Sequence, residues 1–161
     1  VLMVFYNLRK KLPVKLLLVG DGPERIRIES LCRELGTCDD IRFLGKLDQI
    51  EEVLSVSDLF IMPSEKESFG LAALEAMACE VPVISSNAGG LPELNINGQS
   101  GFMSNVGDVE DMTRNALTIL DDNNLPRFKE GALNRAKDFT VDKILPMYEN
   151  LYLEVLQPQK V

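Results

Sequence analysis

The chain has 161 residues, which is enough for one domain with a substantial hydrophobic core. Hydrophobic residues make up 45% of the sequence and charged residues 26%, as is typical of a globular protein. The formal net charge of −8 argues against a surface that binds nucleic acid, because such surfaces need clustered lysine and arginine. No hydrophobic run approaches the roughly twenty residues of a membrane-spanning helix. The absence of histidine excludes Ser-His-Asp chemistry, histidine bases and histidine-bound metals from within the chain.

The cysteines Cys32, Cys38 and Cys79 are odd in number and show no C-x-x-C spacing. We therefore expect reduced thiols rather than disulfides or a zinc site, and a cytoplasmic location. At the start of the chain, hydrophobic residues precede the basic ones, which is the reverse of a signal peptide. The first residue is not methionine, and we interpret the sequence as a piece of a longer chain.

Short hydrophobic runs alternate with amphipathic stretches along the chain. In chain order, this pattern predicts strands at 15–19, 41–44, 59–62 and 81–85, with a weaker one at 101–104. The predicted helices span 23–35, 49–56, 70–79, 109–120, 125–138 and 141–156. Asp108 and Thr140 are the predicted N-caps of 109–120 and 141–156. Strands joined by helical crossovers predict an α/β fold, with a parallel sheet covered by helices on both faces.

Two features follow from this order of elements. Ligands of parallel α/β sheets bind at the carboxyl ends of the strands, which places the candidate site at loops 20–23, 45–47, 63–70 and 87–92. The region after residue 108 holds three predicted helices and no confident strand. We expect these helices to pack on the sheet or to reach a neighbouring domain.

The glycine-containing loops carry weak signals when each is taken alone. Loop 20–23 follows a strand, but Arg25 occupies the sixth position of the G-x-G-x-x-G dinucleotide pattern, so a plain turn beside a ligand cleft is favoured. No P-loop sequence occurs. Lys46, after Gly45, is interpreted as a solvated charge. The two glycines of loop 87–93 fit equally a close backbone approach to a ligand and a flexible turn before a helix.

The run 64–78 carries the strongest functional signal, because it joins a hydrophobic strand to a strong helix former across Gly70. Glu67 lies in the turn and Glu75 just inside the helix. Free backbone N–H groups at the positive end of a helix suit an anion such as a diphosphate. Two carboxylates beside such an anion suit the hydroxyl groups of sugars attached to it, since each charged hydrogen bond contributes about 1.5–3 kcal/mol.

The helix that follows Gly70 is predicted to bury a stripe of four residues: Leu71, Leu74, Met77 and Ala78. Side chains on a helix tilt toward its N-terminus, which would aim Glu75 back toward the turn that holds Glu67. We therefore expect both carboxylates to face one ligand bound across the turn.

Residues 67–75, Glu-Ser-Phe-Gly-Leu-Ala-Ala-Leu-Glu, resemble the E-x7-E element of the retaining nucleotide-sugar glycosyltransferases of family 4. Further segments match this family in order and spacing: 16–24, 43–45, 57–59, 76–78, 82–84, 89–93 and 97–102. The resemblance covers the chain from about Lys15 to its end. It implies the GT-B architecture, in which two Rossmann-like halves face each other across a cleft. Residues 1–161 resemble only the C-terminal, donor-binding half, truncated at its N-terminus and without the acceptor domain.

The resemblance also implies roles for individual residues. Glu67 would bind hydroxyls of the transferred sugar, as the catalytic residue, and Glu75 the ribose diol of the nucleotide. Backbone N–H groups of Phe69, Gly70 and Leu71 would hold the sugar and the diphosphate. The remaining donor-binding residues would be Ser68, Gly20, and Gly45 with Lys46 near the base.

Within the family, residues 64–71 with 75–79 are similar to the members that move GlcNAc from UDP-GlcNAc to L-malate, the first step of bacillithiol synthesis. The resemblance implies no metal and no cofactor, which fits the lack of a D-x-D motif. It places an Arg/Lys pair that neutralises the diphosphate, and the histidine of the acceptor domain, upstream of Val1. Glu80 replaces a common glycine at the helix end, where a small effect on stability is expected.

Two other functions are compatible with parts of the pattern. A non-catalytic nucleotide-sugar-binding module would keep the same loop, although the intact Glu67 and Glu75 pair argues against degeneration. A family 4 enzyme with another donor or acceptor would also fit. A Rossmann oxidoreductase is disfavoured by Arg25 and by the lack of an acidic residue after a second strand.

Overall fold

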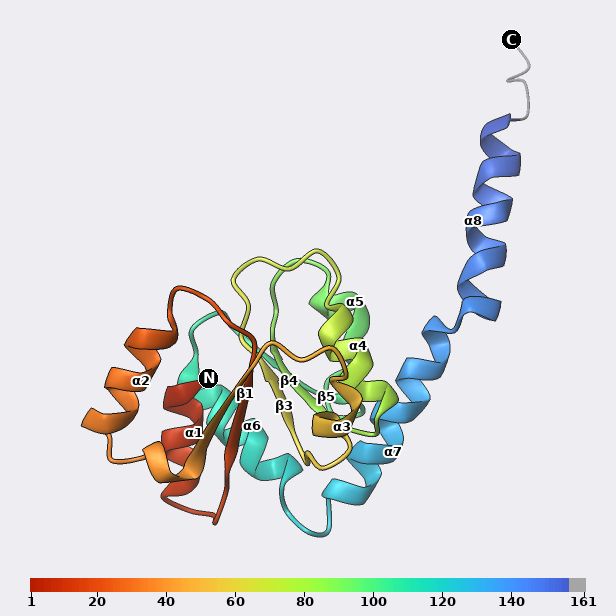
Figure 1. Cartoon of the computed structure of the whole chain (residues 1–161). Helices are drawn as coiled ribbons and strands as arrows, with labels where there is room; N and C mark the ends of the chain where they lie inside the picture. The colour runs from red at the N-terminus through yellow and green to blue at the C-terminus, as the bar shows by residue number, and fades with distance from the viewer. Residues whose placement is uncertain (157–161) are drawn as a thin grey trace.

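Strands and helices alternate along the chain in the computed structural model, which describes residues 1–156 (Figure 1). The strands of this part are β1 (Leu16–Val19), β2 (Ile41–Gly45), β3 (Phe60–Met62), β4 (Val83–Ser86) and β5 (Gly101–Ser104). The α-helices are α1 (Leu2–Arg9), α2 (Arg25–Glu34), α3 (Glu51–Leu54), α4 (Leu71–Ala78), α5 (Leu91–Leu94), α6 (Val109–Ile119), α7 (Leu125–Ala136) and α8 (Val141–Leu156). Two 3₁₀ turns, η1 (Cys38–Asp40) and η2 (Lys137–Phe139), complete the set. Every predicted strand and helix is confirmed, with ends within about two residues.

Two helices, α1 and α5, lie outside the predicted set. Helix α1 forms because Leu2, Val4, Phe5 and Leu8 fall on one side of it and are all buried. Helix α5 has only four residues, and its hydrophobic pattern is too short to be recognised in the sequence. Proline in its first turn suits the start of a helix, because the missing N–H has no intrahelical partner there.

The strands form two parallel sheets rather than one. Strand β1 pairs with β2, and β3, β4 and β5 pair in that order. The parallel pairing is as predicted, whereas the single continuous sheet is not observed in residues 1–156. Strands β1 and β3 therefore each keep one edge without a partner strand in the described part of the chain.

Helices cover both faces of the larger sheet, as predicted. Because successive side chains of a strand point to opposite faces, Phe60 and Met62 pack in the cluster that contains the buried residues of α4. Ile61 packs in the opposite cluster, which contains buried residues of α1 and α6. Helix α6 is capped by Asp108, whose carboxylate accepts the N–H of Asp111 at 2.9 Å, as the sequence predicts.

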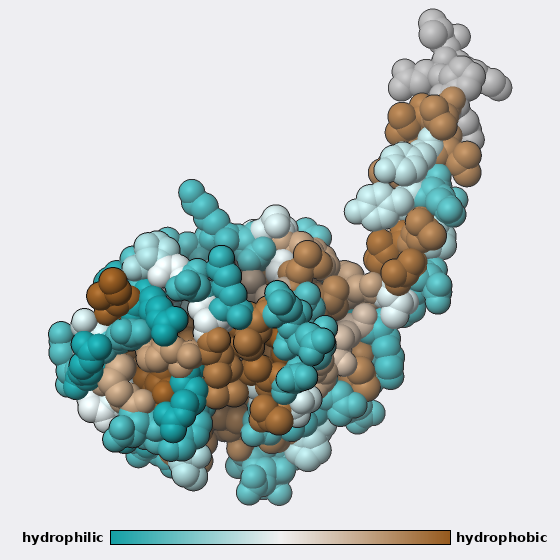
Figure 2. All heavy atoms as spheres, in the orientation of Figure 1, coloured by the Kyte–Doolittle hydropathy of each residue, from teal (hydrophilic) through white to brown (hydrophobic). Residues whose placement is uncertain are grey.

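The C-terminal helices divide into two groups. Helices α6 and α7 pack against the sheet, while α8 extends away from the rest of the molecule (Figures 1 and 2). Helix α8 has no buried residue, and Figure 2 shows hydrophobic residues along it. The most exposed of the large hydrophobic residues of α8 are Val141, Met147, Tyr152, Val155 and Leu156. No helix of residues 1–156 is both long enough and apolar enough to cross a lipid bilayer.

Cys32 and Cys38 form a disulfide with an S–S distance of 2.04 Å, so the expectation of reduced thiols is wrong for these two residues. Cys32 lies in the last turns of α2 and Cys38 begins η1, and the turn between them brings their Cα atoms to 5.1 Å. The short spacing gave no C-x-x-C signal, and the turn that closes it is not visible in the hydrophobic pattern. Cys79 is free and half-buried.

Alkylation of the unfolded, unreduced protein should add one group, at Cys79, because the other two sulfurs are bonded to each other. Alkylation after reduction should add three. Mass spectrometry counts the groups and assigns them to peptides. Three groups without a reductant would contradict the disulfide and restore the expectation of reduced thiols.

Candidate functional site

The candidate site lies at the carboxyl ends of the strands, where the connecting loops meet (Figure 1). The loops after β1 and β2 are joined there, because the Gly20 N–H donates a hydrogen bond to the Gly45 carbonyl at 2.7 Å. Lys46, the next residue, is exposed. The structure thus places Gly20 and Gly45 side by side and leaves the Lys46 side chain to solvent.

The loop after β3 is locked to the loop after β4 by backbone contacts. The Gly90 N–H donates to the Glu67 carbonyl at 3.1 Å. A Cβ atom on Gly89 would lie 1.7 Å from the Glu67 carbonyl oxygen, and one on Gly90 would lie 2.4 Å from that of Ser68. The two glycines therefore permit a close backbone approach, which is one of the two interpretations given for loop 87–93. The backbone that they approach is that of the glutamate loop, the loop of this chain that carries Glu67 and Ser68.

Gly70 turns this loop into α4. Its φ of 99° lies in the left-handed region, and a Cβ atom there would lie 2.7 Å from Cδ2 of Leu91. The Gly70 carbonyl accepts the N–H groups of Ala73 and Leu74, so the N–H groups of Leu71 and Ala72, which come before them, have no intrahelical partner. Such a helix start is suited to an anion.

The two glutamates differ in exposure. Glu67 is half-buried, and its Oε1 accepts the N–H of Ser68 at 3.0 Å, which fixes the carboxylate near the start of the loop. Glu75 is exposed on α4. The segment from Glu67 to Leu71 thus presents a carboxylate, a left-handed glycine and free helix N–H groups within five consecutive residues.

The predicted buried stripe of α4 is wrong in part. The buried residues of this helix are Ala73, Ala76 and Met77, whereas Ala78 is exposed and Leu71 is 66% exposed. Small alanine side chains let α4 lie close to its neighbours, and this close packing decides which side is buried. The largest hydrophobic residues need not face the core. The exposed Leu71 side chain lies directly after the loop that carries Glu67.

The free thiol near this helix is not a candidate nucleophile. Burial raises the pKa of the Cys79 thiol, and the carboxylates of Glu51 and Glu75 raise it further. Cys79 therefore remains a thiol at neutral pH. Within residues 1–156, no group of three or more histidine, cysteine, aspartate or glutamate side chains is placed to hold a metal ion.

The sequence profile described as "Glycosyl transferases group 1" matches residues 1–135. The chain belongs to this family. It is 42% identical over 162 residues to the N-acetyl-alpha-D-glucosaminyl L-malate synthase of Bacillus anthracis, an alignment that covers 99% of this chain and 42% of that protein. It is 37% identical over 118 residues to a sulfoquinovosyl transferase of Arabidopsis thaliana, with 70% of this chain and 22% of that protein covered. The chain therefore spans less than half the length of these glycosyltransferase relatives.

Solved structures of glycosyltransferases have the same fold. The pneumococcal O-GlcNAc transferase GtfA, in complex with UDP and GlcNAc, superposes with a TM-score of 0.85 at 19% identity over 97% of this chain and 32% of that chain. Anabaena HepE in complex with UDP superposes with a TM-score of 0.81 at 28% identity over 93% of this chain and 44% of that chain. These likenesses confirm the predicted fold class, the Rossmann-like α/β fold of GT-B glycosyltransferases.

Gly89→Ala is expected to lower the free energy of unfolding by about 2 kcal/mol or more, because the new methyl group collides with the Glu67 carbonyl at a φ of 55°. Gly22→Ala is the matched control, since a Cβ atom there meets nothing within 4 Å. Urea denaturation of both variants provides the comparison. Equal stabilities would show that the two loops do not approach each other as closely as the structure has them.

Proposed function

We propose that this glycosyltransferase chain binds a nucleotide-sugar donor, UDP-GlcNAc, and that the complete enzyme transfers GlcNAc to L-malate with retention of configuration. The observation that carries the proposal is the segment from Glu67 to Leu71, in which a fixed carboxylate precedes a helix start with free N–H groups. A nucleotide sugar has hydroxyl groups for the carboxylate and a diphosphate for the N–H groups.

We assign the roles along the donor from the sugar to the base. Glu67 binds hydroxyls of the transferred sugar, and Glu75 binds the ribose diol. Ser68 and the backbone N–H groups of Phe69, Gly70 and Leu71 hold the sugar and the diphosphate. Gly20, Gly45 and Lys46 border the base, and the hydrogen bond between the first two supports their place in one wall of the site.

The choice of donor and acceptor rests on the relatives. HepE and the pneumococcal transferase were solved with UDP, and the relative of Bacillus anthracis is named for GlcNAc and L-malate. In the proposed reaction, the bond between the anomeric carbon and the diphosphate breaks, and its electron pair leaves with UDP. The malate hydroxyl forms the new bond on the same face of the sugar, and its proton passes to the departing phosphate oxygen.

The proposed reaction uses no metal and no cofactor, and stabilisation of the departing UDP is assigned to the start of α4 and to cationic groups. The proposed location is the cytoplasm. The Cys32–Cys38 disulfide is the one feature of residues 1–156 that opposes this location, because disulfides are rare in reducing compartments.

In the full-length protein, Glu75→Gln should weaken UDP binding about tenfold or more, since a charged hydrogen bond to the ribose is worth about 1.5–3 kcal/mol. Glu67→Gln should leave UDP affinity unchanged within about twofold and weaken UDP-GlcNAc, whose sugar it contacts. Isothermal titration with UDP, UDP-GlcNAc, GDP-mannose and NAD measures both effects. Glu65→Gln, an exposed change in the same loop, is the control.

Binding of NAD in preference to UDP would overturn the proposed function. Binding of UDP-GlcNAc by a full-length protein that transfers no sugar would favour the non-catalytic module instead. Equal losses in all three variants would refute the separate roles of the two glutamates.

We further propose that residues 1–161 are the C-terminal, donor-binding half of a longer enzyme whose upstream part supplies the acceptor domain. The lengths of the relatives support this, because the chain spans 42% of the malate synthase of Bacillus anthracis.

The separation of the strands into two sheets supports the proposed upstream part independently. A cavity of about 630 Å³ lies along β1 and β3 and is lined by hydrophobic residues that include Phe5, Leu17, Val19, Leu54 and Ile61.

The facing edges of the two sheets are suited to one more strand. The Phe60 N–H donates to Pro82 and the Gly20 N–H to Gly45. Because backbone groups alternate in direction along a strand, those of Ile61 and Val19 point away from these partners, toward the cavity. Figure 2 shows hydrophobic residues gathered in the middle of the face of the molecule that it presents.

A parallel strand of about four residues preceding α1 would pair with β1 and β3, with α1 as the right-handed crossover. Val1 itself lines the cavity, so the polypeptide before it has a short path into the space. With helices on both faces, this strand should be hydrophobic throughout.

Hydrogen exchange of the full-length protein tests the added strand. The N–H groups of Val19 and Ile61 should exchange as slowly as that of Ile84, which lies in the central strand β4, because both would be hydrogen-bonded to the added strand. Fast exchange at Val19 and Ile61 in the full-length protein would show that no strand fills the space.

A further inference from the structure

Arg135, in the last turn of α7, holds the end of α5 from outside the candidate site. Its Nε donates to the Leu94 carbonyl at 2.9 Å, and its Nη2 donates to the Glu93 carbonyl. These are the last carbonyl groups of α5, a helix too short to satisfy them itself. The Arg135 side chain is 20% exposed; its hydrogen bond to the Leu94 carbonyl is partly buried and that to the Glu93 carbonyl is exposed.

The same guanidinium contacts the glutamate loop through an aromatic pair. It lies 4.7 Å from the centre of the Phe139 ring. The Phe139 ring meets the Phe69 ring edge-on, with 5.4 Å between the ring centres and an angle of 67°. Phe69 lies in the middle of the segment from Glu67 to Leu71, between Ser68 and Gly70.

Arg135 is therefore connected to the glutamate loop by two routes. Through α5 it reaches Gly90, whose N–H binds the Glu67 carbonyl. Through Phe139 it reaches Phe69. Asn95, directly after α5, adds a fixed point, since its buried Nδ2 donates to the Val83 and Phe102 carbonyls at 3.1 Å.

We propose that Arg135 is a positioning residue for donor binding: together with Phe139, it sets the placement of the segment from Glu67 to Leu71. This inference rests on the proposed function, in which that segment binds the nucleotide sugar. Arg135 does not touch the donor in this proposal and acts only through α5 and Phe139.

The geometry requires arginine rather than any cation. A planar guanidinium donates to two adjacent carbonyls, donates to Asp138 at 3.2 Å, and stacks on an aromatic ring at the same time. A lysine ammonium has neither the planar face nor the fixed fork of donors. Arg135→Lys thus keeps the charge and removes the geometry.

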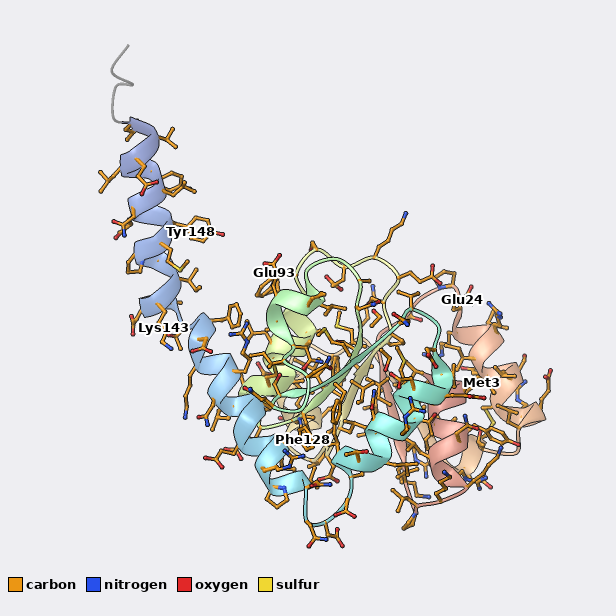
Figure 3. All side chains as sticks on the ribbon, turned by 180° about the vertical axis from the view of Figure 1, so that it is seen from behind. Met3, Glu24, Glu93, Phe128, Lys143 and Tyr148 are labelled. Atoms are coloured by element: carbon orange, nitrogen blue, oxygen red, sulfur yellow. A yellow bond between two sulfur atoms is a disulfide. The ribbon has the colours of Figure 1, made fainter. Side chains whose placement is uncertain are left out.

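Asp138 connects this arrangement to α8. Its carboxylate accepts hydrogen bonds from Lys143, at 3.0 Å, and from Arg135, and these bonds, that from Lys143 first, hold the pKa of Asp138 below its usual range. Figure 3 shows Glu93 on α5 and Lys143 at the start of the protruding helix α8. The direction in which α8 leaves the domain is thereby linked to the same guanidinium that supports the glutamate loop.

The test compares Arg135→Lys with Arg127→Lys in the full-length protein. Arg127 lies on the same helix, with its guanidinium 4.4 Å from the Phe128 ring, and is exposed. Arg135→Lys should speed hydrogen exchange at residues 67–70 and 91–95 and leave exchange in β4 unchanged. It should also raise the KM for the donor about fivefold, with the KM for the acceptor unchanged. Arg127→Lys should change neither readout.

A second variant, Phe139→Leu, removes the aromatic route and keeps α5 held. It should speed exchange at 67–70 only. Unchanged exchange at 67–70 in Arg135→Lys would overturn the inference, whatever the ligand of the wild-type protein proves to be. Absence of nucleotide-sugar binding in the wild-type protein would instead overturn the proposed function and would leave the exchange result to decide the positioning of the loop.

Discussion

The hydrogen bond between the Gly90 N–H and the Glu67 carbonyl is the contact on which the candidate site depends. It forms only because Gly89 and Gly90 carry no Cβ atom at a place where a methyl group would lie 1.7 Å or 2.4 Å from a backbone oxygen. Two loops that leave neighbouring strands thereby become one rigid unit. The free N–H groups of α4 and the carboxylate of Glu67 then have fixed relative positions, which the proposed donor site requires.

Much of this arrangement was predictable from the residues, and the parts that were not have identifiable causes. Strands such as Val83–Ser86 are short hydrophobic runs between turns, and Asp108 is a capping residue ahead of a periodic helix, so local patterns suffice. The buried side of α4 was predicted incorrectly because hydrophobicity ranks Leu71 above Ala73, whereas close packing of a helix favours the smaller side chain. The roles of Arg135 and the Cys32–Cys38 disulfide depend on how distant turns meet, and no periodicity carries that information.

The split between the two sheets shows a further limit of pattern reading. A hydrophobic run predicts a strand but not the strands with which it pairs. From the sequence alone, Leu16–Val19 and Phe60–Met62 are therefore predicted to belong to one sheet. The structure instead leaves their facing edges unpaired across a hydrophobic cavity. Unpaired, apolar strand edges are unfavourable in water, since they expose both hydrophobic side chains and backbone hydrogen-bonding groups. The cost of this exposure is the physical reason to expect another strand there.

The negative charge of the chain and of the diphosphate bears on both the cavity and the proposed reaction. The chain carries a net charge of −8, and a diphosphate is itself an anion. The long-range electrostatic field of the chain therefore does not attract the donor. A helix start offsets only about 0.3–1 kcal/mol of this repulsion. In the proposed function, binding of UDP would therefore rest on hydrogen bonds to the ribose and the backbone, and the charge on the departing diphosphate would need cations from elsewhere. A strand between β1 and β3 would end at the same edge as its neighbours, between Gly20 and the glutamate loop. The loop after that strand would lie beside the diphosphate, so one upstream segment would both complete the sheet and carry the Arg/Lys pair that the family resemblance places before Val1.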